Sequence, residues 1–281
     1  MNAVNAVNAV NAERKDVLLR AERVSLDLGG HRILRDVSLE IRNLVCPGKI
    51  TGQVVGLLGP SGMGKTQLLR ILAGLAAPTE GSVRLTPAQV PVRPGLVGVV
   101  TQDCALFEHR TVLGNLCVAG RQAGRSAASA RAEARALLGR FGLRGQEALY
   151  PAQLSGGQRQ RVAIAQQLMC SEHYLLMDEP FSGLDPLAQS EVCRVITEVA
   201  SAHELNTIVV ITHDIRAAIE VADELWLLGR DRDEAGRPIE GARIQATYDL
   251  VSRGLAWHPD LAHAPELAPL VEEVRGRFAQ L

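Results

Sequence analysis

Residues 59–66 read Gly59-Pro60-Ser61-Gly62-Met63-Gly64-Lys65-Thr66, which is the G-x-x-x-x-G-K-[ST] pattern of a phosphate-binding loop. An apolar run at 54–58 predicts the strand that enters the loop, and residues 67–75 predict the helix that leaves it. The glycines let successive backbone N–H groups point at phosphate oxygens, and the helix adds its positive N-terminal end. We therefore expect Lys65 to reach the β- and γ-phosphates of a nucleotide and the Thr66 hydroxyl to bind Mg²⁺.

A second glycine-containing stretch stands where another helix is expected to begin, and it reads Leu154-Ser155-Gly156-Gly157-Gln158-Arg159-Gln160-Arg161. Ser155 can cap that helix, and the glycines permit a phosphate to approach its N-terminus closely. One nucleotide does not need two phosphate clamps in one subunit. Two copies of the chain packed head to tail would use one clamp of each kind on every nucleotide, so the sequence predicts a dimer.

Two short apolar runs end in residues suited to phosphate chemistry. The run at 174–177 is followed by Asp178 and Glu179, and the run at 207–211 leads to His213. Neighbouring side chains alternate along a strand, so the two carboxylates cannot have the same role. We assign Asp178 to the Mg²⁺ sphere and Glu179 to polarising the attacking water. An imidazole at His213 can hydrogen-bond the γ-phosphate.

Together these motifs resemble the ATP-binding subunits of the ATP-binding cassette (ABC) transporters, over about residues 17–230. The resemblance implies hydrolysis of ATP, with Glu179, His213 and Gln102 acting on the water. It also implies that Thr66, Gln102 and Asp178 hold Mg²⁺. The residues implied to contact the nucleotide are Gly59, Pro60, Ser61, Gly62, Met63, Gly64, Lys65 and Thr66, with Ser155, Gly156, Gly157, Gln158 and Asp185.

The resemblance also implies roles for three loops. Gln102 corresponds to the family's hinge glutamine, which connects to a helical subdomain. The stretch 106–112, with Asn115, looks like the segment that faces a membrane subunit. The stretch Ser182-Gly183-Leu184-Asp185 resembles the loop that communicates between the two sites of a dimer.

The chain departs from the family pattern at two positions. Leu28 stands where the family usually has an aromatic ring that stacks on adenine, and residues 1–106 contain no Tyr or Phe that could replace it. Gln166 stands where an arginine is common. Neither departure removes a phosphate or Mg²⁺ ligand, but Leu28 predicts weak selection of the base.

The order of the expected elements predicts the fold class. Strands alternating with helices favour a parallel sheet covered on both faces. The resemblance implies an α/β P-loop NTPase with a mixed, mostly parallel sheet, an N-terminal antiparallel β subdomain and an inserted helical subdomain at about 103–160. Two strands are expected around Gly29-Gly30 within 17–42, and residues 43–52 look like a loop with a local insertion.

The two ends of the chain are expected to lie outside this domain. Residues 1–16 contain an Asn-Ala-Val repeat, which predicts a disordered tail. Residues 231–281 are expected to form a C-terminal extension, with a β segment near 241–248 and an amphipathic helix near 266–280.

Composition excludes several classes of protein. The net charge of −1 argues against a general nucleic-acid binder. Five scattered cysteines form no CxxC or Cys/His cluster, which argues against a zinc site or a disulfide framework. No apolar run approaches the ~18–20 residues that span a bilayer. Any membrane role is therefore expected to come through a partner.

The resemblance favours the cytoplasmic ATPase subunit of an importer, peripheral on the inner face of the cell membrane. It implies a homodimer or a paralogous second ATPase subunit, transmembrane permease subunits and a periplasmic solute-binding protein, and no nucleic acid. Residues 249–259 faintly resemble tails in the nitrate, sulfonate and taurine branch. The alternatives are a soluble, non-transport ABC ATPase and a nucleotide-dependent regulatory module.

Overall fold

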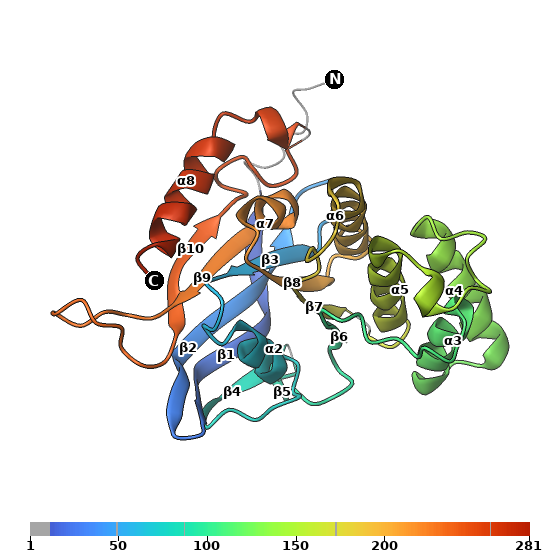
Figure 1. The fold of residues 1–281 in the computed structure, drawn as a ribbon, viewed down its shortest axis with the longest axis horizontal. Coiled ribbons are helices and arrows are strands. Elements are labelled where there is room, and N and C mark those ends of the chain that lie inside the picture. Colours follow the sequence, from blue (N-terminus) through green and yellow to red (C-terminus); the bar gives the residue numbers. More distant parts are fainter. Residues whose placement is uncertain (1–11, 49, 87, 172, 259) are drawn as a thin grey trace.

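The computed structural model describes residues 12–281 except 49, 87, 172 and 259. Its strands form two sheets, one of four strands and one of six. Figure 1 shows a group of helices at one end of the molecule and a C-terminal helix on the opposite side. This arrangement confirms the expected α/β fold with a separate antiparallel sheet and an inserted helical region.

The four-stranded sheet is antiparallel and begins the domain. Its order is β2-β1-β4-β5, formed by β1 (Glu13–Leu28), β2 (His31–Val45), β4 (Glu80–Leu85) and β5 (Val90–Pro91). Gly29 and Gly30 form the turn between β1 and β2 with positive φ angles of 59° and 82°, as the glycine pair predicts. β4 and β5 were not expected from the sequence, because each strand is too short to show a clear alternation of apolar and polar residues.

Both boundaries expected near this sheet need correction. Residues 13–16 belong to β1 rather than to a tail, because Glu13 and Arg14 pair with Val45 and Leu44 of β2. The same pairing extends β2 three residues into the expected loop at 43–52. Leu44 is buried and donates its N–H to the buried Gln53 side chain at 3.1 Å. The remainder of the expected tail, residues 1–11, lies outside the described residues.

The six-stranded sheet carries the candidate site. Its order is β10-β9-β3-β8-β7-β6, with parallel pairing from β9 to β6 and an antiparallel β10 at the edge. The strands are β3 (Gln53–Leu58), β6 (Gly98–Val100), β7 (Tyr174–Asp178), β8 (Thr207–Thr212), β9 (Glu224–Gly229) and β10 (Arg243–Asp249). All six residues of β3 and of β8 are buried, as expected for strands covered on both faces.

Two apolar layers hold this sheet in place. On one face, Val55 and Leu57 of β3 pack with α2 (Lys65–Leu72) and the antiparallel sheet. On the other face, Val54 and Leu58 pack with α6 (Pro186–Ala200), α7 (Ile215–Val221) and α8 (Leu267–Phe278). Alternate residues of one strand therefore belong to opposite layers, which fixes its register. β9, α6 and α7 were not expected from the sequence.

The helical region inserted between β6 and β7 lies at the edge of the molecule (Figure 1). It contains α3 (Val112–Gln122), α4 (Ala127–Arg140), a short 3₁₀ turn at Pro151–Gln153 and α5 (Gly156–Leu168). Thr111, Ser126 and Ser155 cap the three helices through their side-chain oxygens. The caps explain why each helix begins where it does.

The C-terminal residues pack against the same core as the parallel sheet. β10 and α8 correspond to the strand and helix expected near 241–248 and 266–280. Leu267, Leu270 and Val274 of α8 are buried in the core layer that contains α6 and α7. No helix among the described residues is long and apolar enough to cross a membrane.

Replacing Leu270 by alanine is expected to destabilise the whole domain. Leu270 is 1% exposed within the shared core, and deleting a buried leucine side chain costs about 2–5 kcal/mol. Leu187→Ala is the control, because Leu187 is 81% exposed and should change the free energy of unfolding by less than about 0.5 kcal/mol. Equal denaturant midpoints for the two variants would show that α8 does not contribute to the core.

Candidate functional site

Several of the expected site residues meet at one edge of the parallel sheet. A cavity of about 430 Å³ lies at the carboxyl ends of β3, β6 and β7, which is where open parallel sheets bind ligands. Its lining includes the motif residues Lys65, Thr66, Gln102, Asp178 and Glu179. Ser61, Gly62, Gly64 and Gln67 complete the side formed by the phosphate loop and the start of α2.

The phosphate loop has the tight backbone that its glycines predict. Gly64 has a φ of 85°, and a Cβ atom there would lie 2.8 Å from Ile33 Cγ2, so a larger residue is excluded. Lys65 Nζ donates hydrogen bonds to the carbonyl oxygens of Gly59 at 2.7 Å and Pro60 at 3.1 Å. Burial lowers the pKa of Lys65, and the nearby Glu179 and Asp178 oppose that shift. The loop thus carries a partly desolvated cation beside two carboxylates.

Two oxygen ligands suited to a hard cation lie together next to this lysine. The Thr66 hydroxyl donates to Asp178 Oδ2 at 2.7 Å. Burial raises the pKa of Asp178, and the neighbouring Glu179 raises it further, while Thr66 and Lys65 lower it. A hydroxyl and a carboxylate at hydrogen-bond distance suit Mg²⁺, which takes oxygen ligands and keeps several waters. Gln102 lines the same cavity and donates to Ser182 Oγ at 3.3 Å.

Glu179 is held in an unusual conformation just after β7. Its φ is 49°, in the left-handed region that costs a non-glycine residue roughly 1–3 kcal/mol. Its N–H donates to the Ile211 carbonyl at 2.8 Å. Its Oε2 accepts a hydrogen bond from Thr212 Oγ1 at 3.2 Å and lies 2.9 Å from His213 Nδ1. Residues 34 positions apart in sequence therefore form one acid–base pair.

Two apolar side chains also line the cavity. Leu28, 46% exposed, and Ile33 line it from the two strands that meet at the glycine turn. The sequence placed Leu28 at the position of a base-stacking ring, and the structure brings it to the cavity. Ile33 was missed, because only the pairing of β1 with β2 places it beside Leu28.

Ser155 lies at the start of α5 and is not among the residues that line the cavity. Its Oγ accepts the Gln158 N–H at 3.3 Å, and Gln158 Oε1 accepts the Ser155 N–H at 2.9 Å, which forms a capping box. A Cβ atom at Gly157 would lie 2.9 Å from the Ala188 Cβ, so this glycine lets α5 approach α6 closely.

Asp185 also acts as a helix cap in this structure. Its Oδ1 accepts the N–H groups of Leu187 and Ala188, both at 2.9 Å, at the start of α6. Gln166, the second departure from the family pattern, is buried on α5 and donates to Asn115 Oδ1 at 3.4 Å. Its side chain therefore belongs to an internal network and not to the cavity.

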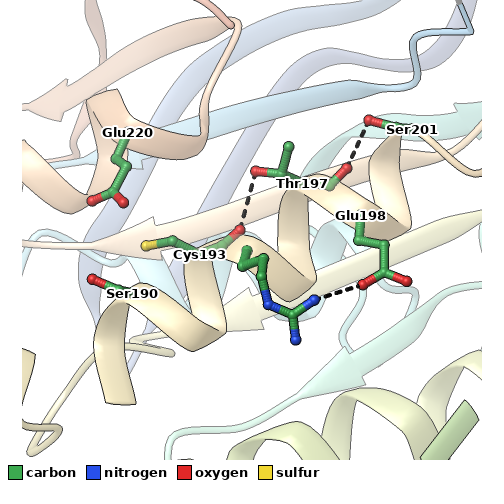
Figure 2. A pocket seen from close by; sticks show the side chains of 7 residues that line it. Ser190, Cys193, Thr197, Glu198, Ser201 and Glu220 are labelled. Carbon is green, nitrogen blue, oxygen red and sulfur yellow. Dashed lines mark hydrogen bonds and ion pairs between the residues drawn. The ribbon is translucent and has the colours of Figure 1, made fainter. Parts of the chain in front are cut away.

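A second cavity, of about 420 Å³, contains none of the motif residues. Figure 2 shows its labelled residues on α6 and α7, which are Ser190, Cys193, Thr197, Glu198, Ser201 and Glu220. Burial raises the pKa values of the Cys193 thiol and the Glu220 carboxyl, which favours their neutral forms. Arg194 is paired with Glu191 and Glu198 at 3.2 and 3.0 Å. This cavity therefore lacks an uncompensated cation that could bind phosphate.

The chain is similar to import ATPases along most of its length. It is 40% identical over 230 residues to the sulfate/thiosulfate import ATP-binding protein CysA 2 of Rhizobium meliloti, covering 79% of this chain and 60% of that protein. It is 41% identical over 225 residues to CysA of Bordetella parapertussis, covering 77% of this chain and 61% of that protein. The chain thus spans about three fifths of the length of these relatives.

Two further comparisons concern the fold and the family. CbiO1 of Clostridium perfringens, part of the ABC transporter complex cbiONQ, has the same fold, with a TM-score of 0.70 and 23% identity, covering 92% of this chain and all of that one. Residues 49–182 match the ABC transporter family model. That range includes the phosphate loop, Gln102, Ser155, Asp178 and Glu179. The chain therefore contains an ATP-binding domain of the ABC transporter family.

Proposed function

We propose that this chain binds ATP with Mg²⁺ and hydrolyses it to ADP and phosphate to power transport by a separate membrane permease. The observation that carries the proposal is the convergence of Lys65, the Thr66–Asp178 pair and the Glu179–His213 pair on one edge of the sheet. Phosphoryl transfer to water needs positioning and charge neutralisation more than covalent chemistry. These groups supply both at one edge of the sheet, where Glu179 lines the cavity and His213 contacts it without being part of the lining.

Each group has a distinct part in this mechanism. Lys65 and the N–H groups of the phosphate loop bind the phosphates, and Thr66, Asp178 and Gln102 would hold Mg²⁺. When bound, the cation neutralises charge on the phosphate oxygens. Glu179 accepts a proton from the attacking water, and His213, at 2.9 Å, orients its carboxylate. The contacts of Glu179 with Thr212 and His213 favour hydrolysis over a switch that only binds nucleotide.

The complete site requires a second subunit. Ser155 and Gly156 start a helix whose N-terminal end is suited to a phosphate, yet neither residue lines the cavity of its own chain. Head-to-tail pairing of two chains gives each nucleotide the phosphate loop of one chain and the α5 N-terminus of the other. We infer a homodimer or a pair of paralogous subunits, with Asp185 near the contact.

The two CysA relatives support a role in import. Both are import ATP-binding proteins, and we place this chain as a peripheral subunit on the inner face of the cell membrane, bound to permease subunits that work with a periplasmic solute-binding protein. The exposed Phe107, 43% accessible, lies in the loop expected to face the permease. The ATPase cavity contacts nucleotide and not solute, so the permease and binding protein determine the transported solute.

Glu179→Gln is expected to lower the ATP hydrolysis rate by about 100-fold or more, because a positioned general base contributes roughly 10²–10⁴-fold. The amide keeps the size of the side chain, so ATP binding should persist and the ATP-bound dimer should live longer. Steady-state phosphate release and nucleotide binding measure the two effects. Glu220→Gln, outside the cavity, serves as control. A wild-type rate in Glu179→Gln would show that this carboxylate is not the base.

Mixing two inactive variants is expected to restore activity if the sites are shared. A Ser155→Arg chain keeps its phosphate loop, and a Lys65→Ala chain keeps its α5 N-terminus, so each heterodimer has one complete site of two. Each variant alone should be inactive. Phosphate release by the mixture should recover to at most half the wild-type rate per dimer. A mixture without activity would contradict the shared site. So would a wild-type hydrolysis rate that stays strictly proportional to chain concentration at every dilution.

Leu28→Tyr is expected to tighten ATP binding by about tenfold, since base–aromatic stacking is worth roughly 1–3 kcal/mol. The wild-type chain should use ATP and GTP comparably, because phosphate contacts do not distinguish bases. Calorimetric titration with each nucleotide measures both. Leu75→Tyr is a matched control, with 47% exposure against 46% for Leu28 but a position outside the cavity. Unchanged or weaker ATP binding in Leu28→Tyr would place the base elsewhere.

A further inference from the structure

A third cavity, of about 400 Å³, lies where the carboxyl end of β9 meets β10 and the end of α8. Figure 1 shows these three elements side by side near the C-terminus. Leu227, Arg230 and Gln245 line the cavity from the sheet, and Arg277 and Leu281 line it from the end of the chain. It shares no lining residue with the cavity at the phosphate loop.

The one carboxylate side chain in its lining, Asp231, is fully engaged. Asp231 Oδ2 pairs with Arg35, and with Arg243 Nε at 2.8 Å, and its Oδ1 accepts from Gln245 Nε2 at 3.0 Å. Burial alone would raise the pKa of Asp231, but the hydrogen bonds from Gln245 and Arg243 and the charges of both arginines lower it. Arg35 and Arg243 do not line the cavity, so Asp231 is neutralised from outside it.

Three guanidinium groups remain without a compensating charge. Within the described part of the chain, Arg230, Arg232 and Arg277 form no ion pair with a carboxylate. Arg232 donates to the carbonyls of Gln280 and Gly236, both at 2.9 Å. These neutral acceptors leave its positive charge in place.

Arg230 carries a second sign of an unfilled partner. Its Nε is buried and has no hydrogen-bond partner among the residues that the structure describes. A buried donor on a charged group costs free energy when it is left unpaired, so such groups nearly always have a partner. Arg277 lies with its guanidinium carbon 6.0 Å from the Tyr248 ring centroid, a contact that holds the side chain in place without satisfying its N–H donors.

We propose that this cavity is a binding site for a free tetrahedral oxyanion, sulfate or phosphate. Guanidinium groups present paired N–H donors whose spacing matches two oxygens of such an ion. Arg230 and Arg277 supply these donors from two different elements, and Arg232 adds charge beside them. The Gln245 amide is already bonded to Asp231 and to the Gly229 carbonyl at 3.2 Å, and so helps to hold the carboxylate in place.

The site is separable from the phosphate loop by experiment. In a full-length Lys65→Ala background, which removes the main cation of the loop, calorimetric titration with sodium sulfate and with sodium phosphate should still show binding. Adding Arg230→Gln should weaken it by about tenfold or more, the size expected for loss of a charge-assisted hydrogen bond. Arg277→Gln should have a similar effect. Titration with sodium chloride at equal ionic strength corrects for screening.

Arg275→Gln is the matched control, because Arg275 lies on the same helix, pairs with Glu272 and does not line the cavity. It should bind both oxyanions as the Lys65→Ala parent does. Midpoints of thermal unfolding, measured without anion, identify any variant that fails to fold. If either Arg230→Gln or Arg277→Gln fails to fold, the other variant tests the proposal. The proposal is overturned if the parent binds neither oxyanion, or if folded Arg230→Gln or Arg277→Gln binds them with the affinity of Arg275→Gln.

Discussion

The hydrogen-bond register between β3, β8 and β7 is the constraint on which the ATP site depends. Leu58 pairs with Thr212, and Asp178 pairs with Ile211. Because these strands are parallel, the phosphate loop, Glu179 and His213 all emerge at the same edge. A slip of one residue would turn each buried side chain to the opposite layer. The two apolar layers of the core therefore fix the relative positions of residues that are more than 100 positions apart.

The charged groups at this edge lie close to one another and to polar partners. Lys65 is buried beside Asp178 and Glu179, and each carboxylate already has a polar partner in Thr66 or His213. Desolvation raises the pKa of Asp178 and lowers that of Lys65, so each group favours its neutral form more than in water. A bound nucleotide phosphate would stabilise the charged form of Lys65, and a bound divalent cation would stabilise the charged form of Asp178.

The helical region presents the helix N-terminus that takes part in the proposed shared site. The α5 N-terminus is capped by Ser155, and α5 is held close to α6 through Gly157. Its position is therefore set by packing within the subunit, while the proposed dimer would bring it to a nucleotide held by another chain. The buried contacts of Gln160 with Cys104 at 2.6 Å and of Gln166 with Asn115 at 3.4 Å attach α5 to the residues that follow Gln102. The two halves of the proposed shared site are thus physically connected inside each subunit.

The motifs could be predicted from the sequence because each consists of residues that are close together along the chain. A glycine-rich loop before a helix, a serine cap and a carboxylate after an apolar run all involve neighbouring residues, and the alternation of strands and helices predicted the fold class. The tertiary structure alone decided which distant groups meet. It placed Ile33 beside Leu28, brought His213 within 2.9 Å of Glu179 and buried Gln166. It also extended β1 to Glu13 and gathered Arg230 and Arg277 around one cavity. These contacts follow from strand pairing and core packing, which depend on the whole chain and leave no signal within a short stretch of sequence.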